Sequence, residues 1–172
     1  LVYQETYHKD EYAKHHLKGK KSNFDFRLTT PERVANSGID KIGLGSLFGL
    51  ADWRADAIVL ASHLRFMEKN HWQSRYSISF PRLRPCEGNE QNQSGMNEKQ
   101  LLQLICAFRL FSPTVELSLS TRETSHFRDN AFALGITTMS AGSVTQPGGY
   151  ANAEPTLEQF SIDDNRQPDL VA

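Results

Sequence analysis

The sequence of 172 residues is short of cysteine, of net charge and of long apolar runs. Its two cysteines, Cys86 and Cys106, form no CxxC pair and are too few for a disulfide framework or for the three or four thiolates of an iron–sulfur cluster. So few cysteines favour a reducing compartment such as the cytoplasm. Nineteen basic residues balance 20 acidic ones, which argues against nucleic-acid binding driven by bulk charge. The longest apolar, charge-free run, Ile42–Ala51, is too short to cross a bilayer.

What is present is a regular alternation of apolar or β-branched runs with helical patterns. The runs predict five strands, at Leu1–Thr6, Ile42–Leu44, Arg75–Phe80, Val115–Thr121 and Ile136–Ser140. Strands that alternate with helices predict βαβ units and a parallel sheet in an α/β fold. Five strands suffice for a doubly wound sheet but fall short of the eight in a closed (β/α)₈ barrel.

Four helices are predicted between these strands from capping residues and apolar spacing. Thr30 is the expected cap of a helix that begins at Pro31 and ends before Gly38. Asn97 and Gln100 form a capping pair for a second helix. The other two span Asp52–Asn70 and Glu123–Ala133. The buried faces are expected to comprise Trp53, Ala57, Leu60, Leu64 and Met67 in one helix, and Leu101, Ile105 and Phe108 in another.

Polar residues follow the predicted strands, where the ligands of parallel α/β proteins gather. Arg122 comes directly after a strand, so its guanidinium could hold a carboxylate through two parallel hydrogen bonds, or form a structural ion pair with a helix acid. Glu5 could accept hydrogen bonds from vicinal hydroxyl groups, or remain solvated. The glycines around Ser46 would allow a planar ligand to approach the backbone.

Other signals of chemistry are weak. The sequence has no GxSxG, P-loop or HExxH motif. His8, His15 and His16 make a poor metal site, because adjacent histidines of a helix point apart. Position and spacing alone therefore predict only a ligand-binding half of an α/β domain.

The runs at the strand ends, taken together, are similar to one enzyme family. They are VYQETY at 2–7, GIDKIGLG at 38–45, WQSRYSISFPRLRPC at 72–86, LSLSTRE at 117–123 and SAGSVTQPGGY at 140–150. From Leu1 to about Asn165 the sequence resembles the 2-iminoacetate synthases, the radical S-adenosyl-L-methionine tyrosine lyases of thiamine thiazole biosynthesis.

This resemblance implies the carboxyl-terminal half of a TIM-type (β/α)₈ barrel, with parallel strands four to eight of the radical enzyme, over residues 1–172. Such carbon–carbon lyases cleave S-adenosyl-L-methionine reductively at a [4Fe–4S] cluster. The resulting radical attacks L-tyrosine at its amino group, and the Cα–Cβ bond breaks to give 2-iminoacetate (dehydroglycine) and 4-cresol. The implied partners are the thiazole synthase that consumes 2-iminoacetate and an electron donor such as flavodoxin.

The resemblance also implies roles for individual residues, none of them catalytic, because the cofactor generates the radical. Arg122 would hold the tyrosine carboxylate, with Ser120 and Ser140 beside it. The residues that would bind S-adenosylmethionine are Glu5 at the ribose with Gln4 next to it, Arg27 at the methionine carboxylate, and the backbone of Leu47 and Gly49 at the adenine.

One departure from the family is large. Its CxxxCxxC cluster loop lies in the amino-terminal half and does not occur in this sequence, so we expect a fragment of a longer protein. Three alternatives remain open: the related tyrosine lyase of hydrogenase maturation, a lyase for another aromatic amino acid, and a non-catalytic half-barrel that binds a nucleoside or amino acid. The run Trp72–Pro85 and Cys86 favour the thiazole branch over the hydrogenase branch.

Without cluster thiolates, the 172-residue polypeptide by itself should be inert. Anaerobic iron reconstitution is expected to give no [4Fe–4S] absorption and no deoxyadenosine. Because half a barrel leaves strand edges and apolar surface in contact with water, we also expect this polypeptide to be aggregation-prone or molten. Deoxyadenosine above an enzyme-free control, or a monodisperse monomer with a sharp thermal transition, would contradict these expectations.

Overall fold

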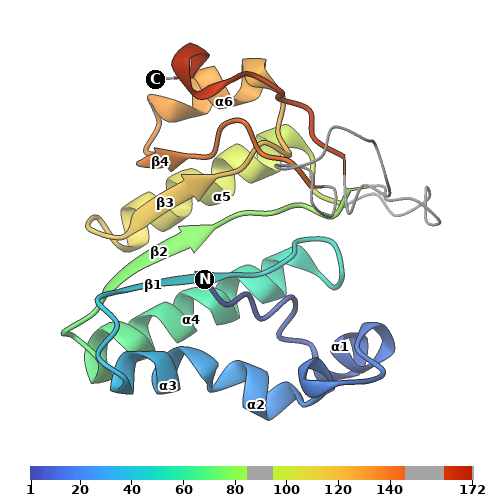
Figure 1. Ribbon diagram of the computed structural model, residues 1–172, viewed down its shortest axis with the longest axis vertical. Coiled ribbons are helices and arrows are strands. Elements are labelled where there is room, and N and C mark those ends of the chain that lie inside the picture. Colours follow the sequence, from blue (N-terminus) through green and yellow to red (C-terminus); the bar gives the residue numbers. More distant parts are fainter. Residues whose placement is uncertain (85–94, 146–160, 172) are drawn as a thin grey trace.

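The computed structural model describes residues 1–84, 95–145 and 161–171. Within these residues the strands form a four-stranded parallel sheet in the order β1-β2-β3-β4 (Figure 1). The strands are β1 (Lys41–Gly45), β2 (Arg75–Ser79), β3 (Glu116–Leu119) and β4 (Thr138–Met139). The prediction of a parallel α/β sheet is therefore confirmed.

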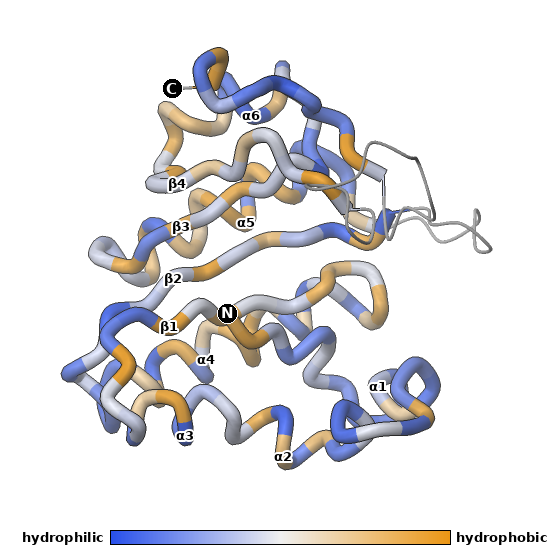
Figure 2. Tube along the Cα trace, in the orientation of Figure 1, coloured by the Kyte–Doolittle hydropathy of each residue, from blue (hydrophilic) through white to orange (hydrophobic). Residues whose placement is uncertain are grey.

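Helices connect successive strands. The sheet connections are α4 (Trp53–Asn70), α5 (Glu98–Phe111) and α6 (Ser125–Phe132), and the chain before β1 forms α1 (Lys9–His15), α2 (Phe24–Leu28) and α3 (Thr30–Asn36). Two 3₁₀ turns, η1 (Lys20–Ser22) and η2 (Pro168–Leu170), complete the described elements. Figure 2 shows mainly hydrophilic residues around α1. None of the helices in the described parts of the chain is long and apolar enough to span a membrane.

The caps of these helices confirm one prediction and correct two. At α5, Asn97 and Gln100 form the predicted capping box. The cap predicted for α3 is wrong: Thr30 is already helical, and its hydroxyl donates to the carbonyl of Phe26. Helix α6 starts later than predicted, because Thr124 accepts the capping hydrogen bond from the backbone of Phe127.

The two faces of the sheet differ in character because side chains alternate along each strand. One face carries Ile42, Leu44, Tyr76, Ile78, Leu117 and Leu119, which form a single core with α4, α5 and α6. The opposite face carries glycine and serine at positions 43, 45, 77, 79 and 118. Closed (β/α)₈ barrels usually fill this inner face with bulky aliphatic side chains. The small residues here leave room above the sheet.

The first predicted strand, Leu1–Thr6, is wrong as a strand, although its position beside β1 is right. Its backbone donates from Val2 to Gly43 and from Gln4 to Gly45, at 3.2 and 3.0 Å. A regular parallel ladder would continue from Leu47 to the carbonyl of Gln4, but the Leu47 N–H donates to Glu5 instead, at 2.7 Å. Only an isolated bridge joins Glu5 to Ser46. One extra residue therefore makes a bulge at Gln4–Glu5.

The last predicted strand, Ile136–Ser140, is longer than the strand that forms. Only Thr138 and Met139 belong to β4. Thr137 and Ser140 still donate to the carbonyls of Leu117 and Leu119, at 2.9 and 3.1 Å. Within the described residues β4 pairs only with β3, so it is an edge strand.

The segment 161–166 is anchored at the carboxyl ends of β3 and β4. The backbone of Asp163 and Asp164 donates to the carbonyl of Thr121, at 3.1 and 3.2 Å. The buried Asp164 carboxylate pairs with the buried Arg128 and, at 2.8 Å, with Arg166. Hydrogen bonds from Arg166 lower the pKa of Asp164 to about 2. This carboxylate is thus the main polar anchor of the segment.

Asp164→Asn should destabilise the full-length protein in a pH-dependent way. The folded-state pKa lies below the usual 3.8, so the carboxylate stabilises the fold above pH 4 and loses this effect as the pH falls towards 2. We expect the free energy of unfolding to fall by about 2 kcal/mol at pH 7, measured by denaturant titration, and the difference from wild type to shrink between pH 4 and 2. Asp169→Asn, at an exposed position of η2, is the control. A deficit that does not vary with pH would contradict this role.

Candidate functional site

A cavity of about 250 Å³ lies at the carboxyl ends of β2, β3 and β4. All three residues predicted to hold the substrate, Arg122, Ser120 and Ser140, line it. Leu1 and Tyr3 line it as well and rest on the glycines of β1. A Cβ atom at Gly45 would lie 2.8 Å from the Tyr3 ring, so this approach requires glycine. The glycines of β1 therefore make room for the chain's own aromatic side chain, which the sequence analysis did not predict.

Arg122 is half-buried at the rim of this cavity. Its Nη1 donates to the carbonyl of Arg82 at 3.2 Å, and its backbone N–H donates to Ser120 Oγ at 3.4 Å. Burial lowers the pKa of Arg122, and the nearby charge of Glu5 acts in the opposite direction. An arginine remains cationic at neutral pH in such surroundings. The cavity thus has a fixed positive charge next to two serine hydroxyls.

Arg82 and Arg84 gather around Glu123, and both contact Arg122. Arg82 and Glu123 are buried and form a bidentate pair, with Nε to Oε1 at 2.9 Å. Arg84 contacts Glu123 at 3.2 Å and Asp163 at 3.1 Å, and it donates to the carbonyl of Arg122. The cluster thus fixes the backbone of Arg122 next to the cavity.

No binding or ion-pair role was predicted for Arg82 or Glu123, although both lie in the polar runs after predicted strands. Glu123, which precedes α6, forms ion pairs with Arg82 and Arg84 of the neighbouring strand end. Position along the chain could not distinguish these arginines. Arg82 and Glu123 are 41 residues apart in the sequence. They meet because β2 and β3 pair in the sheet, which places the segments that follow these strands side by side.

The residues predicted to bind the cofactor gather around the bulge. The Glu5 carboxylate lies 2.6 Å from Lys21 Nζ and 3.8 Å from Arg27 Nη2. Arg27 also donates from Nε to the carbonyl of Tyr3, at 2.8 Å. The backbone N–H of Leu47 is bonded to Glu5, and Gly49 follows in a loop with φ 120°. The structure thus brings Glu5, Arg27 and Leu47 together.

Gln4 is buried beside them, with 4% of its surface exposed. Its amide nitrogen and oxygen have no hydrogen-bond partner among the described residues. A buried amide without partners is costly, and a polar ligand group would remove that cost.

Tyr3 connects the two groups of residues. Its ring lines the cavity of Arg122, and its carbonyl holds Arg27. The charge of Glu5 also raises the pKa of Arg122. The predicted substrate side and cofactor side are therefore neighbours. The alternation of residues 1–5 and the glycines at 43 and 45 were the sequence signals that could have revealed Tyr3.

The described residues do not fit an iron–sulfur cluster. Cys106 is a partly buried residue of α5, and Cys86 lies outside the described residues. Among the residues that the structure describes, no three His, Cys, Asp or Glu side chains lie close enough together to hold a metal ion. His8 caps α1, and His16 stacks on Tyr12 at 4.2 Å between ring centroids.

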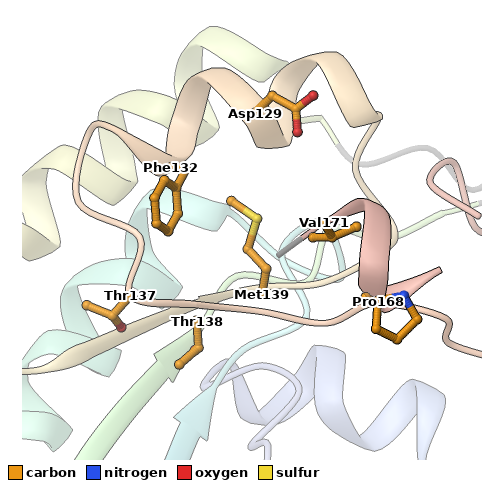
Figure 3. Close-up of a pocket in the computed structure, with 8 residues that line it drawn as sticks. Asp129, Phe132, Thr137, Thr138, Met139, Pro168 and Val171 are labelled. Carbon is orange, nitrogen blue, oxygen red and sulfur yellow. The ribbon is translucent and has the colours of Figure 1, made fainter. Parts of the chain in front are cut away.

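A larger hollow of about 600 Å³ lies elsewhere, between α6, β4 and η2. Figure 3 shows Asp129 and Phe132 on α6 above Thr137 and the β4 residues Thr138 and Met139. Asp129 already pairs with Arg166 at 2.8 Å. The hollow follows the open edge of β4 and is lined by none of the residues predicted to bind substrate or cofactor, so it is not the candidate site.

Fold and site together define a part-barrel α/β protein with a polar ligand cavity at the carboxyl ends of its strands. Residues 79–172 match the family model described as the Biotin and Thiamin Synthesis associated domain. The chain belongs to this family.

Its relatives agree with this assignment. The sequence is 61% and 59% identical over the whole chain to the 2-iminoacetate synthases of Salmonella typhimurium and Escherichia coli, and it covers 46% of each. A biotin synthase of Persephonella marina is 30% identical over 78% of the chain and 42% of its own length. The chain thus spans less than half the length of these curated relatives. The predicted resemblance to 2-iminoacetate synthases is confirmed.

Solved structures agree on the fold. The FeFe-hydrogenase maturase HydG from Carboxydothermus hydrogenoformans has a TM-score of 0.87 and 33% identity, with 99% of this chain and 39% of that one covered. A second crystal structure of HydG gives a TM-score of 0.86 and 34% identity over 98% of this chain and 37% of that one. The predicted partial TIM-type barrel is confirmed by this likeness.

Glu123→Gln should destabilise the full-length protein, because it leaves Arg82 and Arg84 next to a neutral buried group. We expect a loss of about 3–5 kcal/mol in the free energy of unfolding, measured by denaturant titration. Glu116→Gln is the matched control, because it removes the same charge from a partly exposed pair with Lys41 and should cost about 1 kcal/mol or less. Equal losses in the two variants would show that the buried cluster is not a special constraint.

Proposed function

We propose that this chain is the carboxyl-terminal half of a 2-iminoacetate synthase, a radical S-adenosylmethionine lyase that splits L-tyrosine into 2-iminoacetate and 4-cresol for thiazole formation. The observation that carries the proposal is the convergence of Arg122, Ser120 and Ser140 on one cavity. Identities of 61% and 59% to 2-iminoacetate synthases, against 33% and 34% to HydG, favour this lyase over the hydrogenase maturase.

In this proposal the cavity holds the amino-acid end of tyrosine. The guanidinium of Arg122 binds the substrate carboxylate through charge-assisted hydrogen bonds. The hydroxyls of Ser120 and Ser140 can hydrogen-bond the carboxylate or the amino group, because a hydroxyl both donates and accepts. The half-burial of Arg122 strengthens the pairing, because water competes less for a partly desolvated guanidinium.

The cofactor side is proposed to bind S-adenosylmethionine through Glu5, Arg27, Gln4, Leu47 and Gly49. Glu5 accepts hydrogen bonds from the ribose hydroxyls, and Arg27 binds the methionine carboxylate. The unpartnered amide of Gln4 and the closeness of an acid to an arginine support this assignment. When bound, S-adenosylmethionine reduced at a [4Fe–4S] cluster supplies the radical chemistry. The cluster ligands would come from the other half of the protein, since this chain has only two cysteines.

The remaining partners follow from the same proposal. A radical lyase of this kind needs a one-electron donor such as flavodoxin. The imine product hydrolyses readily, so transfer to a thiazole synthase bound to the enzyme would protect it. We propose the cytoplasm as its compartment, in keeping with the low cysteine content.

The reaction is tested on the full-length protein, reconstituted anaerobically with iron and sulfide. With S-adenosylmethionine, dithionite and tyrosine it should give 4-cresol and 2-iminoacetate, the latter recovered as glyoxylate and ammonium after hydrolysis. Phenylalanine and tryptophan in place of tyrosine test the alternative of another aromatic substrate. Deoxyadenosine formation without 4-cresol would refute the tyrosine lyase assignment.

Arg122→Ala in the full-length protein should weaken tyrosine binding. Loss of a desolvated carboxylate partner is expected to cost about 2–5 kcal/mol, read by calorimetry with tyrosine. Arg54→Ala removes an exposed guanidinium that stacks on Trp53 and serves as the control, with unchanged affinity. Tyrosine affinity that survives Arg122→Ala unaltered would refute the assignment of this residue.

A further inference from the structure

The bulge at Glu5 is a strained feature that the rest of the chain must hold in place. Glu5 has φ 73°, the one positive φ of a non-glycine residue among the described residues. Such a conformation is strained and persists only where neighbouring contacts enforce it. A bulge re-aims the side chain that it carries. The contacts around Glu5 therefore decide where its carboxylate lies.

On its β1 side the bulge is held by the sheet. The Glu5 carbonyl accepts two hydrogen bonds, from the N–H of Leu47 and from Ser46 Oγ, both at 2.7 Å. The preceding residue, Gln4, is fixed by its bond to Gly45. These contacts fix Gln4 and the Glu5–Thr6 peptide against β1.

On the other side the bulge is held by one carboxylate from α4. Asp56 Oδ1 accepts from Thr6 Oγ1 at 3.0 Å and from the backbone N–H of Tyr7 at 2.8 Å. Thr6 Oγ1 in turn accepts from the N–H of His8 at 3.1 Å. Asp56 and Thr6 are 2% and 0% exposed. The two residues that follow Glu5 are thus tied to a single buried acid 49 and 50 positions away.

Fixing a turn with a buried carboxylate costs free energy, because the charged group loses its contacts with water. Burial raises the pKa of Asp56, and the hydrogen bonds from Tyr7 and Thr6 counter this effect. Its second oxygen, Oδ2, has no hydrogen-bond partner among the described residues. Asp56 lies in the first turn of α4, where the helix dipole stabilises its negative charge only in part. Helix capping does not explain it either, because Asp52 already caps α4.

We propose that Asp56 is a positioning residue for cofactor binding: it locks Thr6 and Tyr7 so that the bulge presents the Glu5 carboxylate to the ribose hydroxyls of S-adenosylmethionine. Glu5 already lies beside Arg27, the residue proposed for the methionine carboxylate. Asp56 touches neither ligand nor Glu5 side chain and acts through the backbone of residues 5–7. The inference rests on the proposed function of Glu5.

The test uses the full-length, cluster-loaded protein and S-adenosylmethionine itself. Asp56→Ala is expected to weaken S-adenosylmethionine binding about tenfold by calorimetry, with tyrosine affinity unchanged. Asp56→Asn keeps an acceptor oxygen in the same place and should recover most of the affinity. Thr6→Val removes one of the two contacts and should have an intermediate effect. Asp52→Asn, an exposed acid of the same helix that keeps its capping oxygen, is the matched control with wild-type affinity.

A purely structural role is distinguished by a double-mutant cycle with Glu5→Gln. If Asp56 acts through Glu5, then Asp56→Ala added to Glu5→Gln changes S-adenosylmethionine affinity by less than twofold. A full tenfold effect in the Glu5→Gln background overturns the proposal, and so does wild-type affinity in a folded Asp56→Ala variant. Should Asp56→Ala fail to fold, the same cycle is run with Thr6→Val. A wild-type protein that binds no S-adenosylmethionine would instead refute the proposed function, and this inference with it.

Discussion

The alternation of side chains along β1, β2 and β3 is the constraint on which the rest of the structure depends. Every second residue is a large apolar one that packs against α4 or α5, and the residues between are glycine or serine. The helix layer can therefore provide a continuous core while the small residues of the opposite face leave room for Leu1, Tyr3 and the cavity. A one-residue slip in register would exchange the two faces and destroy both the core and the cavity. Stability and the room for a ligand are set by the same pattern.

Polar burial is concentrated at the carboxyl ends of the strands. Arg82 and Glu123, Arg128 and Asp164, and Asp56 with Thr6 are all nearly inaccessible to water. A well-packed apolar side chain in place of each of these groups would cost less free energy to bury. Their common effect is to fix backbone where the strands end: Arg84 holds the carbonyl of Arg122, and Asp56 holds Tyr7. The fold thus accepts a cost in stability where a ligand site needs rigid geometry.

The sequence predicted α4, α5 and the inner strands well because their signals are local, whereas α1 and α2 were not predicted. The spacing of Leu60, Leu64 and Met67 and the Asn97–Gln100 capping box need only a few neighbouring residues to be read. The edges were predicted less well. The bulge at Glu5 depends on hydrogen bonds to Ser46 and Leu47, some 40 residues away, which no local pattern encodes. Strand β4 is shorter than predicted, and it pairs only with β3 among the described residues. The local pattern of Ile136–Ser140 does not show on how many sides a strand is paired.

The site shows the same division between local and distant information. Arg122, Ser120 and Ser140 could be placed at strand ends from the sequence, and the sheet brings them to one cavity. Their supports could not be predicted, because Glu123 pairs with arginines of another strand end and Tyr3 enters the cavity from a segment whose register shifts by one residue. The shift matters chemically. Before the bulge, Tyr3 faces the cavity over Gly45; after it, Glu5 is turned to meet Arg27 and Lys21. One inserted residue therefore lets a single short segment reach both groups of residues, with an aromatic ring in the cavity of Arg122 and a carboxylate beside Arg27.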